Sequence, residues 1–296
     1  MTPLIVAALV LVSVALASAL HFGPQKLLMP ERRKPEYYQK KLGFSHPSQI
    51  GLGFVSKTLT TADGYKLSYW MLDNPKCDGA KGTIIYLHGI TDSKVSGLNY
   101  AKAFASSCRK FYLIDLRRHG ESEGKYCTYG YYEKHDVIRL IDEIKRANPQ
   151  TEIVLLGVSM GAAIAIQTAA IDKRISRVVA IAPFYDLFSI ALDHESHQIG
   201  IRSSSLLKLV MHRAERMAEF KAGDVSPAKD IARVDVPVLI VHGEHDKTVK
   251  VKYSKELVKL NRNAELLMVP GAGHADVLEI GGEGYVRKLS EFLNMR

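Results

Sequence analysis

The sequence contains few cysteines and none of the patterns that bind metals or nucleotide cofactors. Its 296 residues include three cysteines, Cys77, Cys108 and Cys127, with no CxxC pair or Cys/His spacing of the kind found in zinc sites. A glycine-rich phosphate-binding loop is also missing. We therefore expect no metal and no cofactor, and we expect the cysteines to be free thiols.

Acidic residues are scarcer than basic ones. Lys and Arg number 40 against 31 Asp and Glu, which gives a net charge of +9, and much of the excess lies between residues 26 and 41. A basic stretch can bind nucleic acid, but no basic patch with interleaved aromatic side chains is present, so we expect no nucleic-acid partner. Because an apolar segment precedes it, this stretch is expected to contact anionic lipid.

The apolar segment at residues 3–20 has no charged side chain. A helix of this length spans about 27 Å, which is just enough to cross the hydrocarbon core of a membrane. No Lys or Arg precedes the segment and several follow it, which favours an uncleaved single-pass anchor over residues 1–22 and a membrane localisation. The alternative is a signal peptide cleaved after the Ala-Ser-Ala sequence at 17–19, which would make the protein secreted or periplasmic.

Beyond residue 50 the hydrophobic pattern becomes regular. Residues 54–61 and 65–72 alternate apolar and polar side chains around Asp63-Gly64, which predicts an antiparallel hairpin. Short apolar runs predict further strands at 82–89, 111–116, 152–157, 177–183, 236–243 and 264–271. Helical periodicity separates several of them, at 131–147, at 251–260 and in the last residues of the chain. This alternation predicts an α/β fold, a mostly parallel twisted sheet of about eight strands with helices on both faces.

The domain organisation follows from where this pattern starts and where it is interrupted. Residues 23–50, rich in proline and charge, are expected to form a basic linker, and residues 51–296 a single domain. Within that domain, residues 185–230 are apolar but contain no strand pattern, and they are too many for a plain loop. We expect them to form a small helical cap over one end of the sheet. The sequence does not determine the oligomeric state.

One buried strand is followed by Gly157-Val158-Ser159-Met160-Gly161 and then by a helix of small residues. This G-x-S-x-G pattern between a strand and a helix is typical of a nucleophile elbow, in which a sharp turn presents the serine hydroxyl. Glycines two positions on either side leave room for the strained backbone. The alternative is that Ser159 is a small residue packed in a tight corner.

A nucleophilic serine needs a base, and the base needs an acid to orient it. Asp246 and His274 each follow a later predicted strand, and the carboxyl ends of parallel strands lie at one edge of a sheet. We therefore expect Ser159, Asp246 and His274 to meet there as a catalytic triad. Glu244 is the alternative acid.

Stabilising the oxyanion of an acyl-transfer reaction requires two N–H donors. One is expected from Met160, directly after the serine, and the other from Ile90, in the loop after an earlier strand. His88 precedes this loop and is expected to hold it by a hydrogen bond. His242 and His245 flank the expected acid and are interpreted as solvated or packing side chains.

Five motifs in order resemble those of the α/β-hydrolase family. Four are LHGI at 87–90, GVSMG at 157–161, GEHD at 243–246 and GAGH at 271–274. The fifth, DLRRHGESEG at 115–124, is similar to the D-x-R-x-x-G-x-S stretch of that family. The resemblance covers residues 54–293 and is greatest to the branch of monoacylglycerol lipases and serine-aminopeptidase-like proteins with a short helical cap. It implies the sheet described above and serine-hydrolase chemistry.

These observations predict a serine hydrolase that cleaves a carboxylic ester, lipid-like or with a short acyl chain, through an acyl-enzyme. The expected partners are a small-molecule acyl ester and a membrane contacted through residues 3–20. An acyl-thioesterase or an aminopeptidase-type peptidase could use the same triad. The peptidase would need carboxylates near the cap, for which Asp193 and Glu195 are the candidates. A membrane-tethered binding protein without activity is the remaining alternative.

Overall fold

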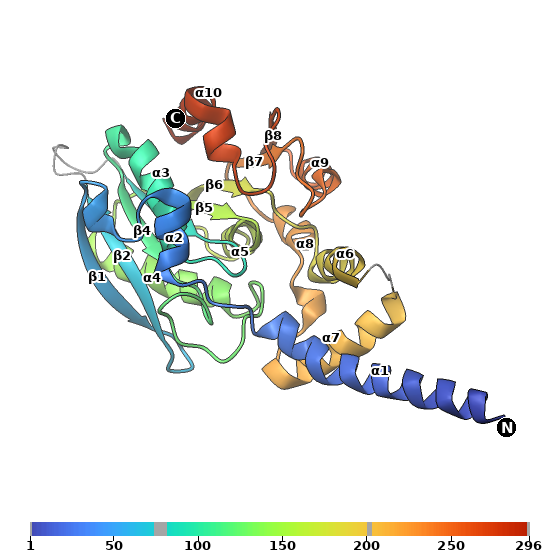
Figure 1. Ribbon diagram of the computed structural model, residues 1–296. Helices are drawn as coiled ribbons and strands as arrows, with labels where there is room; N and C mark the ends of the chain where they lie inside the picture. Colours follow the sequence, from blue (N-terminus) through green and yellow to red (C-terminus); the bar gives the residue numbers. More distant parts are fainter. Residues whose placement is uncertain (1, 74–81, 200–202, 295–296) are drawn as a thin grey trace.

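The computed structural model describes residues 2–73, 82–199 and 203–294, which form one sheet covered by helices on both faces (Figure 1). Eight strands lie in the order β1-β2-β4-β3-β5-β6-β7-β8. The β1–β2 and β2–β4 pairs are antiparallel and all other neighbours are parallel, which confirms the predicted fold class. The strands are β1 (Gly53–Thr60), β2 (Lys66–Asp73), β3 (Thr83–Leu87), β4 (Lys110–Ile114), β5 (Ile153–Val158), β6 (Ile175–Ile181), β7 (Val238–Gly243) and β8 (Ala264–Val269).

The predicted edge hairpin forms at the Asp63-Gly64 turn. Gly64 has a φ of +87°, a conformation that glycine adopts without steric cost, and the Thr61 N–H donates to Tyr65 O at 2.8 Å. Strand β1 is exposed over most of its length, whereas β3 and β5 are buried. The alternating and the continuous apolar runs of the sequence therefore mark the edge and the centre of the sheet.

Two apolar clusters fill the two sides of the sheet. Val137 and Ile141 of α4 (Glu133–Ala147) and Leu257 of α9 (Val251–Lys259) are fully buried on one side. Leu98 of α3 (Gly97–Ala103) and Leu289 of α10 (Val277–Asn294) are fully buried on the other. The helices and short 3-10 turns around the sheet are η1 (Pro47–Gln49), η2 (Lys94–Ser96), α3 (Gly97–Ala103), η3 (Ala105–Ser107), α4 (Glu133–Ala147), α5 (Met160–Ala169), α9 (Val251–Lys259) and α10 (Val277–Asn294).

The long segment between β6 and β7 contains helices joined by turns in the part that the structure describes. It forms α6 (Leu187–Ile199), α7 (Ser204–Ala218), η4 (Ala222–Asp224) and α8 (Pro227–Ile231). Phe184, Leu187 and Met211 belong to a third apolar cluster, which reaches the main domain at Ala163 of α5. These helices therefore have a small core of their own beside the sheet.

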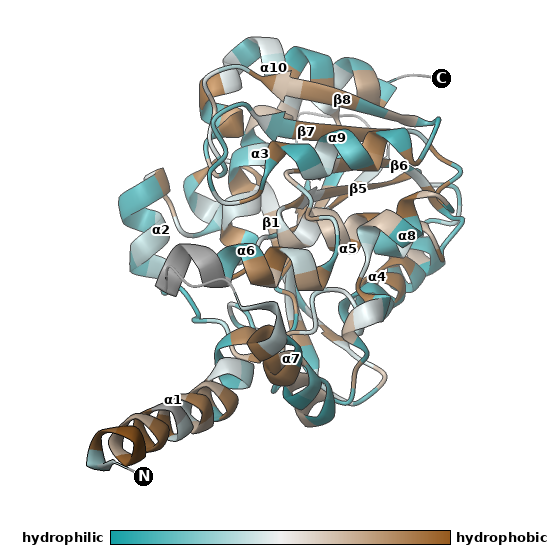
Figure 2. Cartoon of the chain, turned by 90° about the vertical axis from the view of Figure 1, so that its right-hand side faces the viewer, coloured by the Kyte–Doolittle hydropathy of each residue, from teal (hydrophilic) through white to brown (hydrophobic). Residues whose placement is uncertain are grey.

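The N-terminal residues form a long apolar helix and a short second one. Helix α1 (Pro3–Leu28) projects from the domain as an apolar rod (Figure 2). It is long and apolar enough to cross a membrane, with a mean hydropathy of 2.6 over its most apolar window, none of which is buried. Its last residue, Leu28, is instead fully buried against the domain. Helix α2 (Pro35–Leu42) follows and buries Tyr38.

The predicted basic linker at residues 23–50 is more ordered than its composition suggests. Helix α1 continues past the predicted anchor boundary at residue 22, and α2 forms inside the linker. Short helices gain most of their stability from tertiary packing rather than from intrinsic propensity, and here the buried Leu28 and Tyr38 supply that packing. The residues against which Leu28 and Tyr38 pack lie far along the chain, so the local sequence does not reveal these contacts.

The cysteines differ from the expected free thiols in one case. Cys108 is disulfide-bonded, whereas Cys127 is a free and fully buried thiol. Cys77 lies outside the described residues. The prediction is wrong for Cys108 because spacing in the sequence does not show which side chains approach each other in space.

Candidate active site

Ser159 occupies a strained turn between β5 and α5. Its backbone has φ +54° and ψ −113°, a conformation that residues with a side chain rarely adopt. A Cβ atom at Gly161 would lie 2.0 Å from Leu87 O, and one at Gly157 would lie 2.2 Å from Gly161 O. Only glycine fits at either position. The two glycines of the GVSMG motif are therefore explained by the close approach of β3, β5 and α5.

The two backbone N–H groups predicted for the oxyanion hole lie beside this turn. Met160 is the first residue of α5, so its N–H has no acceptor within the helix. A Cβ atom at Gly89 would lie 3.4 Å from Ser159 Cβ, which places the Gly89–Ile90 segment against the serine. Within the described residues neither the Ile90 N–H nor the Met160 N–H has an acceptor. Two unpaired N–H groups beside the serine can bind a developing oxyanion.

His88 holds the loop that carries Ile90. The ring is fully buried. Its Nε2 accepts from the Leu116 N–H at 3.0 Å, and its Nδ1 lies 2.8 Å from Gly89 O. Because Nε2 is an acceptor, the proton is on Nδ1 and the ring is neutral, and burial lowers the pKa of His88 further. The two hydrogen bonds confirm the predicted role of this side chain.

The D-x-R-x-x-G-x-S stretch at residues 115–122 forms the loop after β4, which is hydrogen-bonded to the loop after β3. The Asp115 carboxylate accepts from the Lys94 N–H at 2.7 Å and from Lys94 Nζ at 2.6 Å. It also accepts from the Glu121 N–H at 2.9 Å, and Ser122 Oγ donates to Asp115 O at 2.6 Å. A Cβ atom at Gly120 would collide with the same carboxylate. The stretch therefore ties the loop after β4 to the loop after β3.

His274 and Asp246 are joined by a hydrogen bond. His274 Nδ1 lies 2.7 Å from Asp246 Oδ2. The Asp246 side chain is fully buried, while the His274 side chain is 20 % exposed. The other carboxylate oxygen, Oδ1, accepts from the N–H groups of Thr248 and Val249 at 2.8 and 2.9 Å. The structure therefore brings the predicted acid and base together and leaves His274 Nε2 for another partner.

A second histidine, His242, binds the same carboxylate oxygen. Its Nε2 lies 3.1 Å from Asp246 Oδ2 and 3.0 Å from Val249 O, and its Nδ1 lies 2.6 Å from Ser254 Oγ. Both neighbours of Nε2 are acceptors, so Nε2 carries a proton. Burial by itself would raise the pKa of Asp246, but the hydrogen bonds from His242 and His274 outweigh it and hold that pKa below its ordinary value of 3.8.

The sequence interpretation of the residues around Asp246 missed this contact. The sequence predicts no contact between His242 and the carboxylate, and the signal that could reveal one is the place of His242 in the strand that precedes Asp246. His245 is exposed, as expected. Glu244, the alternative acid, is also exposed and accepts from the Gly271 N–H at 3.2 Å. In the described part of the chain it makes no hydrogen bond to a histidine.

The three residues of the predicted triad follow strands at one edge of the sheet. Ser159 follows β5, Asp246 follows β7 and His274 follows β8, and these strands all run in the same direction. The half-buried Ser159 hydroxyl makes no hydrogen bond to any residue that the structure describes, His274 included. In free enzymes the bond between nucleophile and base is often long and tightens when substrate binds.

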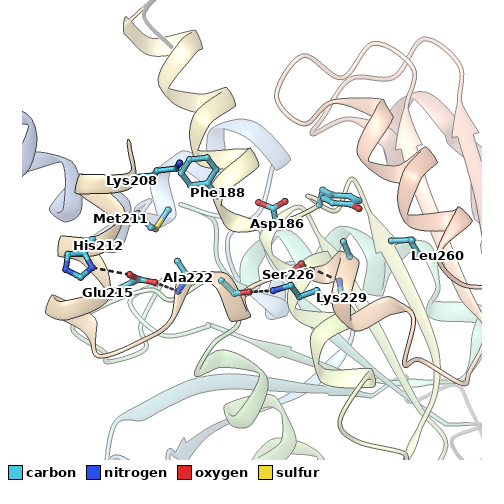
Figure 3. Close-up of a pocket in the computed structure, with 13 residues that line it drawn as sticks. Asp186, Phe188, Lys208, Met211, His212, Glu215, Ala222, Ser226, Lys229 and Leu260 are labelled. Atoms are coloured by element: carbon cyan, nitrogen blue, oxygen red, sulfur yellow. Dashed lines mark hydrogen bonds and ion pairs between the residues drawn. The ribbon is translucent and has the colours of Figure 1, made fainter. Parts of the chain in front are cut away.

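A cavity of about 640 Å³ lies between α6, α7, η4 and α8 (Figure 3). No residue of the predicted triad lines it. Two of its polar side chains are already paired within its lining: Glu215 accepts from the Ala222 N–H at 2.8 Å, and Lys229 Nζ donates to Gly223 O at 2.9 Å. The cavity therefore lies among the helices between β6 and β7 and is separate from the turn at Ser159.

Of the two carboxylates proposed for a peptidase, the structure describes the side chain of Asp193, which is already paired. Asp193 is buried and is bound by Lys250 Nζ and by the Tyr253 hydroxyl, each at 2.5 Å. The Glu195 side chain lies outside the described part. Among the described residues, no group of three or more His, Cys, Asp or Glu side chains could hold a metal ion.

The fold and the site together define the class of the protein. A mostly parallel eight-stranded sheet, a serine in a positive-φ turn between strand and helix, and a histidine–carboxylate pair after the last two strands are features of an α/β hydrolase. The chain has the α/β-hydrolase fold, and the family's sequence profile, described as the alpha/beta hydrolase fold, matches residues 82–222.

Individual relatives agree with this assignment. The chain is 25 % identical over 294 residues to the protein YqkD of Bacillus subtilis, with 96 % of this chain and 94 % of YqkD covered. It is 25 % identical over 187 residues to the Homo sapiens protein ABHD12B, with 61 % and 50 % covered. The solved structure of the Pyrococcus furiosus esterase Pf2001 has a TM-score of 0.70 at 26 % identity, with 84 % and 93 % covered. The family and these neighbours indicate a hydrolase.

Proposed function

We propose that the protein is a serine hydrolase that cleaves carboxylic esters through an acyl-enzyme. The observation that carries this proposal is the 2.7 Å contact between His274 Nδ1 and the buried Asp246 carboxylate, at the sheet edge where Ser159 has a φ of +54°. A carboxylate in this position orients the imidazole so that Nε2 can accept a proton, and it stabilises the imidazolium that then forms. The likeness to the Pyrococcus furiosus esterase supports the same chemistry.

In this mechanism His274 Nε2 removes the hydroxyl proton of Ser159 as Oγ attacks the carbonyl carbon of the ester. The N–H groups of Ile90 and Met160 bind the oxyanion of the tetrahedral intermediate. His274 then gives the proton to the alcohol, which leaves, and the acyl group stays on Ser159. Water, deprotonated by His274, hydrolyses the acyl-enzyme and restores the serine.

The substrate class that fits is an ester with an apolar acyl group, either lipid-like or short. The cap contributes a cluster that includes Phe184, Leu187 and Met211, and this cluster packs on Ala163 of the helix that follows Ser159. The apolar helix α1 is joined to the same cluster through Leu28. An acyl thioester presents the same kind of carbonyl carbon and is the nearest alternative substrate.

An N-terminal peptide fits less well than an ester. An aminopeptidase needs a carboxylate to hold the α-ammonium group of its substrate, and buried charges of this kind must be paired. Asp193 already receives hydrogen bonds from Lys250 and Tyr253. Because its charge is compensated within the protein, Asp193 supports an ester substrate over a peptide.

The test is a panel of p-nitrophenyl esters of graded acyl length, with matching acyl thioesters and aminoacyl p-nitroanilides, run on wild type and Ser159→Ala. We expect the highest kcat/KM for an ester, and a loss of about 10⁵–10⁶-fold in kcat for the variant. A fluorophosphonate probe should label the wild type and not Ser159→Ala. Folded wild-type protein that takes up no probe would contradict the proposal and favour a binding protein without activity.

We also propose that α1 anchors the protein in a membrane. Its 26 residues are long and apolar enough to cross a bilayer. A basic side chain lies in its last turn, at Lys26, and two more follow it, at Arg32 and Arg33, where they can contact anionic headgroups. We expect the full-length protein to stay in the membrane fraction after a carbonate wash. A mature N-terminus directly after residue 19 would show instead that the segment is a cleaved signal peptide.

A further inference from the structure

Tyr38 of α2 reaches the loop that carries Ile90. Its side chain is 1 % exposed, and its hydroxyl donates to Asp92 Oδ1 at 2.9 Å. The ring lies in the same apolar cluster as Tyr86 and Leu98, which keeps the hydroxyl in place. Helix α2 lies outside the residues that match the family profile. The contact therefore joins an N-terminal segment of this chain to the hydrolase core.

Asp92 closes the turn around Ile90. Its N–H donates to Gly89 O at 3.2 Å, which completes a four-residue turn. Thr91, inside the turn, has a φ of +60°, a conformation that persists only when surrounding contacts hold it. The direction of the Ile90 N–H therefore depends on what holds Asp92.

Three donors hold the Asp92 carboxylate oxygen Oδ1. They are the Tyr38 hydroxyl at 2.9 Å, the Ser93 N–H at 2.9 Å and Ser96 Oγ at 2.7 Å. Of these, Tyr38 alone comes from a distant part of the chain. Burial and the charge of Asp92 raise the pKa of Tyr38, so its hydroxyl stays protonated and remains a donor.

The end of α1 also contacts a residue that packs against Met160, the other expected oxyanion donor. Leu28 O, at the end of α1, accepts from the Cys127 N–H at 2.8 Å, and Cys127 Sγ lies 3.4 Å from Met160 Sδ. All three side chains are buried. Leu28 of α1 therefore binds Cys127, whose side chain contacts Met160. Tyr38 of α2 binds Asp92, which closes the turn that contains Ile90.

We propose that Leu28 and Tyr38 position the two N–H groups of the oxyanion hole, with Tyr38 as the principal positioning residue. This inference rests on the proposed function, because it gives the two residues a role in the hydrolytic site. The physical reason is that an oxyanion donor works only at the place where the charge develops, and a small displacement costs a large factor in rate. Without the Tyr38 hydroxyl, the Asp92 carboxylate loses a buried donor and the strained turn relaxes.

The experiment compares full-length Tyr38→Phe with Tyr37→Phe as the matched control. Tyr37 is the preceding residue of α2, is 37 % exposed and lies against Arg33. We expect Tyr38→Phe to lower kcat about tenfold, the loss associated with one hydrogen bond to a charged group, with KM changed by less than about twofold. An oxyanion donor acts in the transition state, so kcat should fall and KM should not. Tyr37→Phe should match the wild type.

A double-mutant cycle tests whether Tyr38 acts through Asp92. Rates are expressed per active site titrated with a fluorophosphonate, so that unfolded protein does not count. In an Asp92→Ala background, which removes the acceptor of the Tyr38 hydroxyl, Tyr38→Phe should change kcat by less than about twofold, because residues that act through one contact are not additive. Equal effects of Tyr38→Phe in the two backgrounds would overturn the assignment.

The inference and the proposed function fail in different ways. If Tyr38→Phe keeps the wild-type kcat while its melting temperature falls, the contact is only structural and the inference is wrong, although Ser159→Ala remains inactive. If the proposed function is wrong, Ser159→Ala keeps the wild-type activity and the fluorophosphonate labels neither protein.

Discussion

His242 Nε2 lies 3.1 Å from Asp246 Oδ2, and neither side chain is exposed to solvent. The same oxygen contacts His274 Nδ1 at 2.7 Å from the other side. Two histidines therefore share one carboxylate oxygen, and only His274 reaches the surface. The carboxylate cannot turn away from His274 without breaking a buried hydrogen bond to His242, which keeps it oriented.

This arrangement predicts that His242 is needed for full activity although its side chain is fully buried. His242→Leu removes a donor to a buried carboxylate, a loss of about 1.5–3 kcal/mol, and should lower kcat for the preferred ester by about ten- to a hundredfold. His242→Gln keeps an N–H donor at a similar place and should lose less. Steady-state kinetics on the two variants checks the order, and equal kcat for His242→Leu and wild type would contradict it.

Asp246→Asn should abolish most of the activity while leaving the fold intact. An asparagine keeps the shape of the side chain, but it can hold the imidazole in the wrong tautomer, which in another serine triad lowers kcat by about 10⁴-fold. Glu244→Gln is the control, because Glu244 is exposed and binds the Gly271 N–H. Its kcat should stay within about twofold of the wild type. A larger loss at Glu244 than at Asp246 would show that the acid is misassigned.

Gly161→Ala should destabilise the protein because no space exists for a methyl group. The new Cβ atom would lie 2.0 Å from Leu87 O, a backbone atom that cannot move without disturbing β3, so we expect a loss of about 1–3 kcal/mol in the free energy of unfolding. Gly223→Ala is the control, since no atom lies within 4 Å of its Cβ position, and it should change the free energy by less than about 0.5 kcal/mol. Urea denaturation measures both.

The ion pair between Asp63 and Arg117 should make stability depend on acid pH. The hydrogen bond from Arg117 is the main cause that lowers the pKa of Asp63 from 3.8 to about 2. A carboxyl whose folded-state pKa is depressed stabilises the protein above its ordinary pKa, and this contribution is lost as the pH falls toward the folded-state value. Because Asp63 is half exposed and water screens the pair, the contribution is about 1 kcal/mol or less.

Comparing wild type with Asp63→Asn checks this sign. The wild type should melt at a higher temperature at pH 6, and the difference in melting temperature should shrink between pH 4 and pH 2. Asp235→Asn is a useful reference, because Asp235 pairs with Lys173 where both side chains are mostly exposed, and it should show little effect. A difference at Asp63 that stays constant down to pH 2 would rule out the proposed linkage.

Periodicity along the chain was sufficient to predict most of the fold. The hairpin at Asp63-Gly64, the buried central strands and the amphipathic helix α4 lie where the local pattern placed them. Each of these elements is specified by neighbours within a few residues, through side-chain alternation or helical spacing. The order of elements then restricts the topology, because a parallel strand is joined to the next by a right-handed crossover.

The sequence by itself also determined that Ser159, Asp246 and His274 follow strands of one sheet, since each stands directly after an apolar run. Their catalytic roles stay a prediction. Only the tertiary structure decided that His242 binds Asp246, that Tyr38 binds Asp92 across 54 positions of the chain, and that Cys108 is disulfide-bonded. The Tyr38 contact depends on which distant side chains are buried together, and the His242 contact, although it joins residues four positions apart, depends on how the chain turns after β7. No local pattern in a sequence records that, because burial is a property of the folded chain.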